Sequence, residues 1–359
     1  MSYEILPVTN FGEQAARVEE LLAYPGSRPD GNFLLTADHV KAAFESHEAF
    51  VAEADTALAA ADQPLIAERI PILAYGANAN PPRMLAKLAK YGIVGEQAMV
   101  PYANVTVPNA AAVWHGQPGQ TGSIFAELYK GEEVEGGQLT THLSYLTPTQ
   151  AAVVHASEGV TYALTSVEAQ VGNQTPQQVL AYAALESTVL LQNGQPVGVE
   201  GLSNSTPLTT MTAREAVAYI LSQPGMAETA EAETPEELVE KGLVLKLVER
   251  KARQTAIGQQ LAALGLRRDY QFPAAATDIV PRLALASQVG NAVSVHGEAT
   301  GAQSVTFAEL ELAHLRAFGF DGKVMPKGDI MTVLRKRAQA EQDYIFRKPR
   351  APGTMPASI

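Results

Sequence analysis

The chain has 359 residues, a length that suits two domains or one domain with large additions. Of these residues 46% are hydrophobic and 18% are charged, so the composition provides ample material for a core and is not that of a disordered chain. Its 26 basic and 38 acidic residues give a net charge of -12, which argues against nucleic acid or an anionic membrane surface as a partner over most of the chain. The absence of cysteine excludes disulfides, thiolate nucleophiles and cysteine metal sites, and is consistent with a reducing compartment, so we expect a cytoplasmic protein.

The first 69 residues are predicted to form a mostly helical extension. Met1 to Leu6 contain no basic stretch followed by an apolar one, so no secretory signal is predicted. Residues 24–31 are rich in proline and glycine and predict a loop. Residues 44–61 then place apolar side chains near one helical face, with acidic side chains between them. No stretch of ~20 unbroken apolar residues occurs anywhere, so no membrane span is predicted.

The character of the sequence changes at Ile70, and the short apolar run over residues 72–75 predicts a strand. It ends in Gly76-Ala77-Asn78 and meets two prolines, which predicts a transition from strand to loop, with a positive φ expected at the glycine. Helical spacing follows over residues 83–90. A loop of this kind, between a strand and a helix, exposes consecutive backbone N–H groups that can bind an anion or an oxyanion, although an ordinary turn would have the same sequence.

Further strands are predicted over residues 123–129 and 160–171. Asn193-Gly194 between two apolar runs predicts a β-hairpin with a type I′ turn. Thr147-Pro148 predicts the start of a short helix between the first two strands. Residues 178–185 are ambiguous because Thr175-Pro176 also suits a helix start; we favour a strand there.

The region after residue 200 is predicted to be mostly helical and to pack on the central domain. Three capping patterns mark helix starts, namely Thr212 with Glu215, Thr234 with Glu237, and Thr306 with Glu309. Residues 335–350 are strongly basic, which fits either a solvated helix face or a phosphate or nucleic-acid surface; we favour the solvated face.

Common catalytic and metal motifs are missing from the sequence. No two of the seven histidines have the i, i+4 spacing of a zinc site, and no HExxH, EF-hand, GxSxG or phosphate-binding GxxxxGK[ST] pattern is present. We therefore expect neither a metal ion nor a cofactor.

Four segments together resemble the γ-glutamylcyclotransferase-like family. The run from Ile72 to Met84 contains Tyr75-Gly76-Ala77-Asn78, where the family typically has Tyr-Gly-Ser-Asn. Residues 153–160 resemble the family's Leu-Asp-x-x-Glu-Gly segment, whose glutamate is the catalytic acid and base. Between them, in the family's order, lie Val113-Trp114-His115-Gly116 and the strand at 122–128. Two departures are Ala77 in place of serine and His155 in place of aspartate.

The resemblance covers residues 70–200 and implies an α+β protein whose central domain is a small mixed barrel-like sheet with helices. The flanks, 1–69 and 201–359, would be helical additions. The family's reaction cyclises a γ-glutamyl amine or peptide, such as those of glutathione metabolism, to 5-oxoproline and a free amine without metal. By resemblance, Glu158 would be the catalytic acid and base. The substrate would be bound by the loop residues Tyr75, Gly76, Ala77 and Asn78, with Tyr162 in support.

The reaction needs few protein groups, which accounts for the sparse motif. The α-amine of the substrate attacks its own side-chain carbonyl, so the protein supplies only a base, donors for the oxyanion and a clamp for the α-carboxylate. Two alternatives remain open: another acyl or amine exchange on a γ-glutamyl amide, and a non-catalytic binding or assembly protein that keeps the fold. The sequence sets neither the amine half of the substrate nor the oligomeric state.

Overall fold

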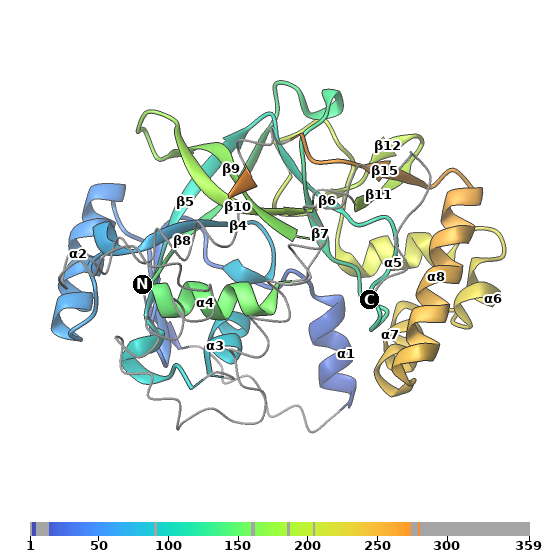
Figure 1. Ribbon diagram of the computed structural model, residues 1–359, viewed down its shortest axis with the longest axis horizontal. Helices are drawn as coiled ribbons and strands as arrows, with labels where there is room; N and C mark the ends of the chain where they lie inside the picture. The colour runs from blue at the N-terminus through green and yellow to red at the C-terminus, as the bar shows by residue number, and fades with distance from the viewer. Residues whose placement is uncertain are drawn as a thin grey trace, which may run out of the picture.

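A computed structural model of the chain describes residues 2–4, 14–89, 92–158, 162–184, 187–203, 205–273 and 279–280 (Figure 1). Helices and strands alternate irregularly, as expected for an α+β protein. The helices are α1 Gln14–Leu22, α2 His47–Ala60, α3 Pro81–Ala89, α4 Pro148–Ser157, α5 Ala213–Leu221, α6 Met226–Ala230, α7 Pro235–Val244 and α8 Leu247–Ala263. Among the described residues, none of these helices is long and apolar enough to cross a membrane.

Five strands close into a mixed barrel in the centre of the molecule. In order around the barrel they are β4 Ile70–Ala74, β8 Gln138–Leu146, β5 Val100–Pro108, β9 Tyr162–Val171 and β10 Gln177–Ala184. Neighbouring strands are antiparallel except at the closing seam, where β10 runs parallel to β4. The predicted mixed, barrel-like sheet is therefore confirmed, and so is the preference for a strand at residues 178–185.

The N-terminal region is not simply helical, which corrects the sequence-based expectation. Its strand β2 Phe33–Leu35 pairs antiparallel with β5, and the strands β3 His39–Ala42 and β1 Ser2–Glu4 continue the sheet outward. The sequence did not indicate these strands because each has only three or four residues, too few for a period of two to be recognised.

Short strands surround the barrel. One small sheet contains β6 Ala111–Trp114, β7 Ala126–Tyr129, β13 Gly198–Val199 and β14 Thr210–Met211. A second small sheet contains β11 Ser187–Gln192, β12 Gln195–Pro196 and β15 Arg267–Tyr270. The strand β16 Ile279–Val280 pairs with β9 of the barrel. The predicted Asn-Gly turn joins β11 and β12. Both of its residues have the positive φ of a type I′ turn, 52° at Asn193 and 79° at Gly194.

Helix starts follow the predicted capping residues. Thr212 and Glu215 form a complete capping box at α5, and the Thr234 side chain accepts a hydrogen bond from the N–H of Glu237 at α7. The Thr147 hydroxyl accepts from the N–H of Gln150 in the first turn of α4. The third pattern, Thr306 with Glu309, and the basic run at 335–350 lie outside the described residues.

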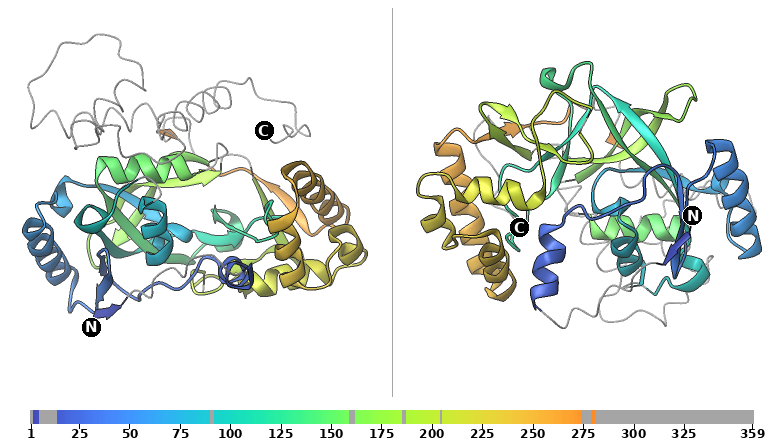
Figure 2. Two further views of the ribbon diagram at one scale, coloured as in Figure 1. Left: turned by 90° about the horizontal axis from the view of Figure 1, so that it is seen from below. Right: turned by 180° about the vertical axis from the view of Figure 1, so that it is seen from behind.

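The described C-terminal residues pack on the central domain, as expected. Leu238 of α7 and Ile257 and Leu261 of α8 belong to the same apolar cluster as Leu73 of the barrel strand β4. Strand β15 also pairs with β11. Figure 2 shows α5 to α8 gathered on one side of the molecule, with α2 at the opposite end. On the other face of β4, Ile72 packs in a second cluster that includes residues of α3 and α4.

His142 of β8 is a buried imidazole whose protonation the fold opposes. Its Nε2 lies 3.0 Å from the carbonyl oxygen of Gly31 and therefore donates to it, and its Nδ1 has no hydrogen-bond partner among the described residues. Burial, the largest cause, and the nearby Arg28 guanidinium lower the pKa of His142 from 6.5 to about 4, against the opposing effect of the Gly31 and Pro29 carbonyls.

We expect this histidine to make the fold less stable in mild acid. Below about pH 6.5 the unfolded chain binds a proton at His142 that the folded protein does not bind until about pH 4, so the free energy of unfolding falls as the pH falls through this window. The full difference corresponds to about 3 kcal/mol. Urea unfolding at pH 7 and at pH 4.5 measures the change in the free energy of unfolding. His142→Gln should reduce the fall, and an unchanged pH dependence in that variant would contradict the assignment.

Candidate active site

The loop that follows β4 carries four of the predicted site residues. Tyr75 and Gly76 leave the strand, and Ala77–Ala79 form a single 3₁₀ turn before α3 begins. The turn is closed by hydrogen bonds from the N–H of Ala79 to the Gly76 carbonyl and from Asn80 to Ala77, both of 3.1 Å. The first N–H groups of such a turn have no acceptor within it, so they are free to face another oxygen.

Glu158 faces this loop, as the sequence predicts. It directly follows α4, and its Oε1 accepts a hydrogen bond of 3.0 Å from the side-chain amide of Asn78. The Glu158 side chain is 17% exposed, so water still reaches the carboxylate in part. The Tyr102 hydroxyl of β5 holds the loop in place by donating a hydrogen bond of 2.8 Å to the Asn78 carbonyl. Residues 80 positions apart in the chain thus meet at one point.

Lys87 is a third member of the group that the sequence did not single out. Its ammonium group lies 2.5 Å from Asn78 Oδ1 and 3.6 Å from Glu158 Oε1, so one lysine contacts both side chains. A helix over residues 83–90 is predicted from the sequence, but a single lysine in it carries no signal. Only the packing of α3 against α4 shows that Lys87 lies on the face directed at Glu158.

Gly76 is required by a close approach and not by a positive φ. Its φ is -130°, so the expectation that this glycine adopts a left-handed conformation is wrong. A Cβ at this position would lie 2.6 Å from the hydroxyl oxygen of Tyr24, which is far inside normal contact. Tyr24 belongs to the loop at residues 24–31, and its approach to Gly76 could not be inferred from the sequence because the two are distant in the chain.

The Tyr24 hydroxyl occupies a position next to backbone donors. Burial raises the pKa of Tyr24 to about 12, while the backbone groups of Ala126 and Ala77 act in the opposite direction, as N–H groups directed at the phenol oxygen do. Arg83 lies over the ring, with its guanidinium carbon 5.4 Å from the centroid. The backbone of the predicted loop therefore does face an oxygen atom, and here the oxygen is that of Tyr24.

Tyr75 of this loop is buried, and Tyr162 of β9 is half-buried. Burial is the main reason that the pKa values of both phenols lie well above 10, and the negative charges of Glu127 and Glu158 both add to it. Both tyrosines therefore remain protonated and act as hydrogen-bond donors. The Tyr75 hydroxyl donates to the Tyr182 carbonyl at 2.8 Å, so it already has an acceptor within the fold.

Glu127 of β7 is a second carboxylate that the sequence did not indicate. It is 2% exposed, and its Oε1 accepts hydrogen bonds from Ser187 at 2.9 Å and from Tyr162 at 3.3 Å. His115 Nδ1 lies 3.0 Å from the same oxygen, so this histidine is held within the fold. Trp114 is fully buried, and its indole N–H donates to the Met211 carbonyl. Tyr162 thus contacts Glu127 directly.

The arrangement supplies a carboxylate, a set of protonated phenols and a turn with exposed N–H groups. In the described part of the chain, no three His, Asp or Glu side chains are grouped closely enough to hold a metal ion. His155 lies within α4. A base and several donors around one loop are the groups that amide chemistry on a small substrate requires.

Comparison of the chain with family models, with curated proteins and with solved structures finds no match.

Proposed function

We propose that this chain cyclises a γ-glutamyl amine or peptide to 5-oxoproline and the free amine, with Glu158 as general base and then general acid. The observation that carries the proposal is the 3.0 Å hydrogen bond between Glu158 and Asn78, because it brings a carboxylate to the loop that would hold the reacting amide. The closed mixed barrel around this loop supports the proposed kinship with the γ-glutamylcyclotransferase-like fold.

In the proposed reaction the atoms balance within one substrate molecule. Glu158 removes a proton from the α-ammonium group, and the resulting amine attacks the side-chain carbonyl carbon, which forms the new C–N bond of the five-membered ring. The C–N bond to the leaving amine then breaks as Glu158 returns the proton to that nitrogen. The ring nitrogen also loses its second proton, which passes to the leaving amine, so the products are the neutral lactam of 5-oxoproline and the ammonium form of the amine. Because the attack is intramolecular, effective concentrations up to ~10⁵–10⁸ M are available to a well-oriented substrate.

Each neighbouring residue has a definite part in this scheme. Asn78 and Lys87 hold the Glu158 carboxylate in place through contacts of 3.0 and 3.6 Å. The protonated hydroxyl of Tyr24 is the donor for the oxyanion that develops on the carbonyl, and the N–H of Ala77 in turn donates to that hydroxyl. Tyr75, Gly76 and Tyr162 shape the surroundings of the loop, and the glycine leaves room for the hydroxyl oxygen of Tyr24 close to the backbone.

The orientation of Glu158 distinguishes the enzyme from a binding protein that only keeps the fold. A glutamate directed at solvent would favour the binding protein, whereas this one is bonded to the loop and mostly buried. An exchange enzyme acting on γ-glutamyl amides would use the same groups, so the experiment has to separate the two reactions.

The test is an assay of 5-oxoproline release over γ-glutamyl amino acids, γ-glutamyl alkylamines and glutathione. We expect release of 5-oxoproline with an equal amount of free amine from at least one class. Transfer of the γ-glutamyl group to an added amine, without 5-oxoproline, would replace cyclisation by exchange. Absence of any reaction with the whole panel would leave the binding protein as the better description.

A further inference from the structure

Glu127 of β7 is the only carboxylate that is buried in the described part of the chain. Its ion-pair partner there is His115 alone, so no lysine or arginine of the described residues balances its charge. A buried carboxylate is costly for a fold unless hydrogen bonds or an opposite charge stabilise it. The reaction proposed above gives Glu127 no part, so its role has to be inferred from the groups that it contacts.

Three side chains meet one oxygen of Glu127. Its Oε1 lies 2.9 Å from the Ser187 hydroxyl, 3.0 Å from His115 Nδ1 and 3.3 Å from the Tyr162 hydroxyl. A carboxylate only accepts hydrogen bonds, so each of the three groups is the donor. The His115 ring also stacks on Phe125, with the ring centroids 4.3 Å apart. Ser187 and His115 therefore hold the carboxylate at the position where it meets Tyr162.

Glu127 and Tyr162 differ in how far a ligand can reach them. The Glu127 side chain is 2% exposed, so a substrate cannot contact it. Tyr162 is only half-buried, and it begins β9 shortly after Glu158. Burial raises the pKa of its phenol most, and the charges of Glu127 and Glu158 both act in the same direction, so the phenol lies within electrostatic reach of the proposed base. Glu127 can thus act on a ligand only through Tyr162.

The hydrogen bond to Glu127 decides how Tyr162 can meet a ligand. A phenol has one hydrogen, and while this hydrogen is donated to Glu127 the phenol oxygen can only accept a further hydrogen bond. An acceptor near the charge of Glu158 suits a cationic donor and not a carbonyl oxygen. The α-ammonium group of a γ-glutamyl substrate, from which Glu158 would remove a proton, is a donor of this kind.

We propose that Glu127 is a positioning residue, which turns the Tyr162 hydroxyl so that its oxygen accepts a hydrogen bond from the α-ammonium group of the substrate. His115 and Ser187 fix Glu127 in this role. The proposal rests on the proposed function and adds to it a residue that never touches the substrate. Without the carboxylate, the phenol hydrogen is free to point at the ammonium group, and the two then repel each other.

A pair of ligands that differ only in the α-amine tests this role. They are γ-glutamylethylamine and 4-(ethylcarbamoyl)butanoate, titrated by calorimetry in the Glu158→Gln background to suppress turnover. We expect tighter binding of the amine compound, and Glu127→Leu should reduce this preference about 10-fold, as the loss of one hydrogen bond to a charged group does. Glu127→Gln keeps an acceptor for Tyr162 and should retain most of the preference. A variant that is only less stable loses affinity for both ligands alike, so the preference separates positioning from stability.

The effect of Glu127 should disappear when Tyr162 has already been replaced. Tyr162→Phe should lower the preference to the same extent as Glu127→Leu, and the double variant Glu127→Leu/Tyr162→Phe should lower it no further. Glu133→Leu is the matched control, because the Glu133 carboxylate also accepts from a tyrosine, at 2.6 Å from the hydroxyl of Tyr129, which is not a candidate site residue. This control should leave the preference intact. If Glu127→Leu does not fold, an unchanged preference in Tyr162→Phe still overturns the proposal.

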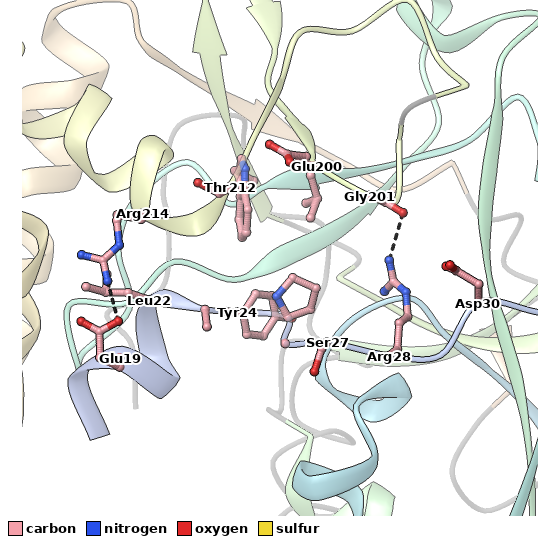
Figure 3. A pocket seen from close by; sticks show the side chains of 15 residues that line it. Glu19, Leu22, Tyr24, Ser27, Arg28, Asp30, Glu200, Gly201, Thr212 and Arg214 are labelled. Carbon is pink, nitrogen blue, oxygen red and sulfur yellow. Dashed lines mark hydrogen bonds and ion pairs between the residues drawn. The ribbon is translucent and has the colours of Figure 1, made fainter. Parts of the chain in front are cut away.

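A cavity of about 710 Å³ between Tyr24 and the segment of Glu200 and Thr212 is the alternative place for these ligands (Figure 3). Neither Glu127 nor Tyr162 lines it, so binding there would be insensitive to all of these variants and would overturn the proposal. Equal weakening of both ligands by Glu127→Leu, or no binding of either ligand, would do so too. Failure of the proposed function looks different: the preference would depend on Glu127 and Tyr162 as expected, while the parent would release no 5-oxoproline.

Discussion

Glu158→Gln should lower kcat for 5-oxoproline release by about 10²–10⁴-fold, because an amide cannot accept the proton of the α-ammonium group. Substrate binding should change little, since the loop amides are untouched. The amide oxygen can still accept the hydrogen bond from Asn78, while the attraction to Lys87 is lost. That ion pair is partly exposed, so the free energy of unfolding should change by less than about 1 kcal/mol.

The control for this substitution is Glu168→Gln on β9. Glu168 is exposed on the outer face of the barrel, so the same chemical change is made away from the loop and should leave both kcat and stability unaltered. Stopped assays for 5-oxoproline give kcat, and thermal unfolding of each variant gives its stability. Turnover at the parent rate in the Glu158→Gln protein would remove Glu158 from the role of base.

Gly76→Ala should have the second large effect, on stability and activity together. The new methyl group would lie 2.6 Å from the Tyr24 oxygen, so either the loop or the tyrosine has to move. Overpacking of this kind costs about 1–3 kcal/mol. Movement of the loop would also separate Asn78 from Glu158 and lower kcat, because small displacements of catalytic groups have large effects on rate.

Tyr24→Phe tests whether contact with the Tyr24 hydroxyl oxygen is the cause of these losses. Removing the hydroxyl leaves the added methyl group 3.7 Å from the nearest ring carbon, which is an ordinary contact, so the double variant Tyr24→Phe/Gly76→Ala should recover much of the stability that Gly76→Ala loses alone. Gly119→Ala is the matched control, since a Cβ there meets nothing closer than 3.4 Å and should have little effect. Additive losses in the double variant would show that the contact with Tyr24 is not the reason for the glycine.

Much of the barrel could be predicted because its signals are local. The strand predicted over residues 72–75, the Asn-Gly hairpin and the threonine caps each depend on a few neighbouring residues, and each is found in the structure. The strands of the N-terminal region could not be predicted in this way. They are too short to show alternation, and β2 is defined by its pairing with β5.

The candidate site also combines residues that the sequence indicates with residues that only the structure reveals. Glu158 and the loop were accessible through a resemblance in motif and order, and the contact between them is present. Tyr24, Lys87 and Glu127 were not accessible, because each is an ordinary residue in its own segment and becomes informative only through a neighbour far away in the chain.

The parallel seam between β10 and β4 has a consequence for how the protein folds. Ile72 pairs with Leu180, so closing the barrel joins segments far apart in the chain, and such non-local pairings form slowly because a long loop must be ordered first. The 75–78 loop extends directly from β4, and Glu158 lies between β8 and β9. A chain that has formed its hairpins but not this seam would contain every residue of the site without their geometry, so the chemistry would appear only with the final step of folding.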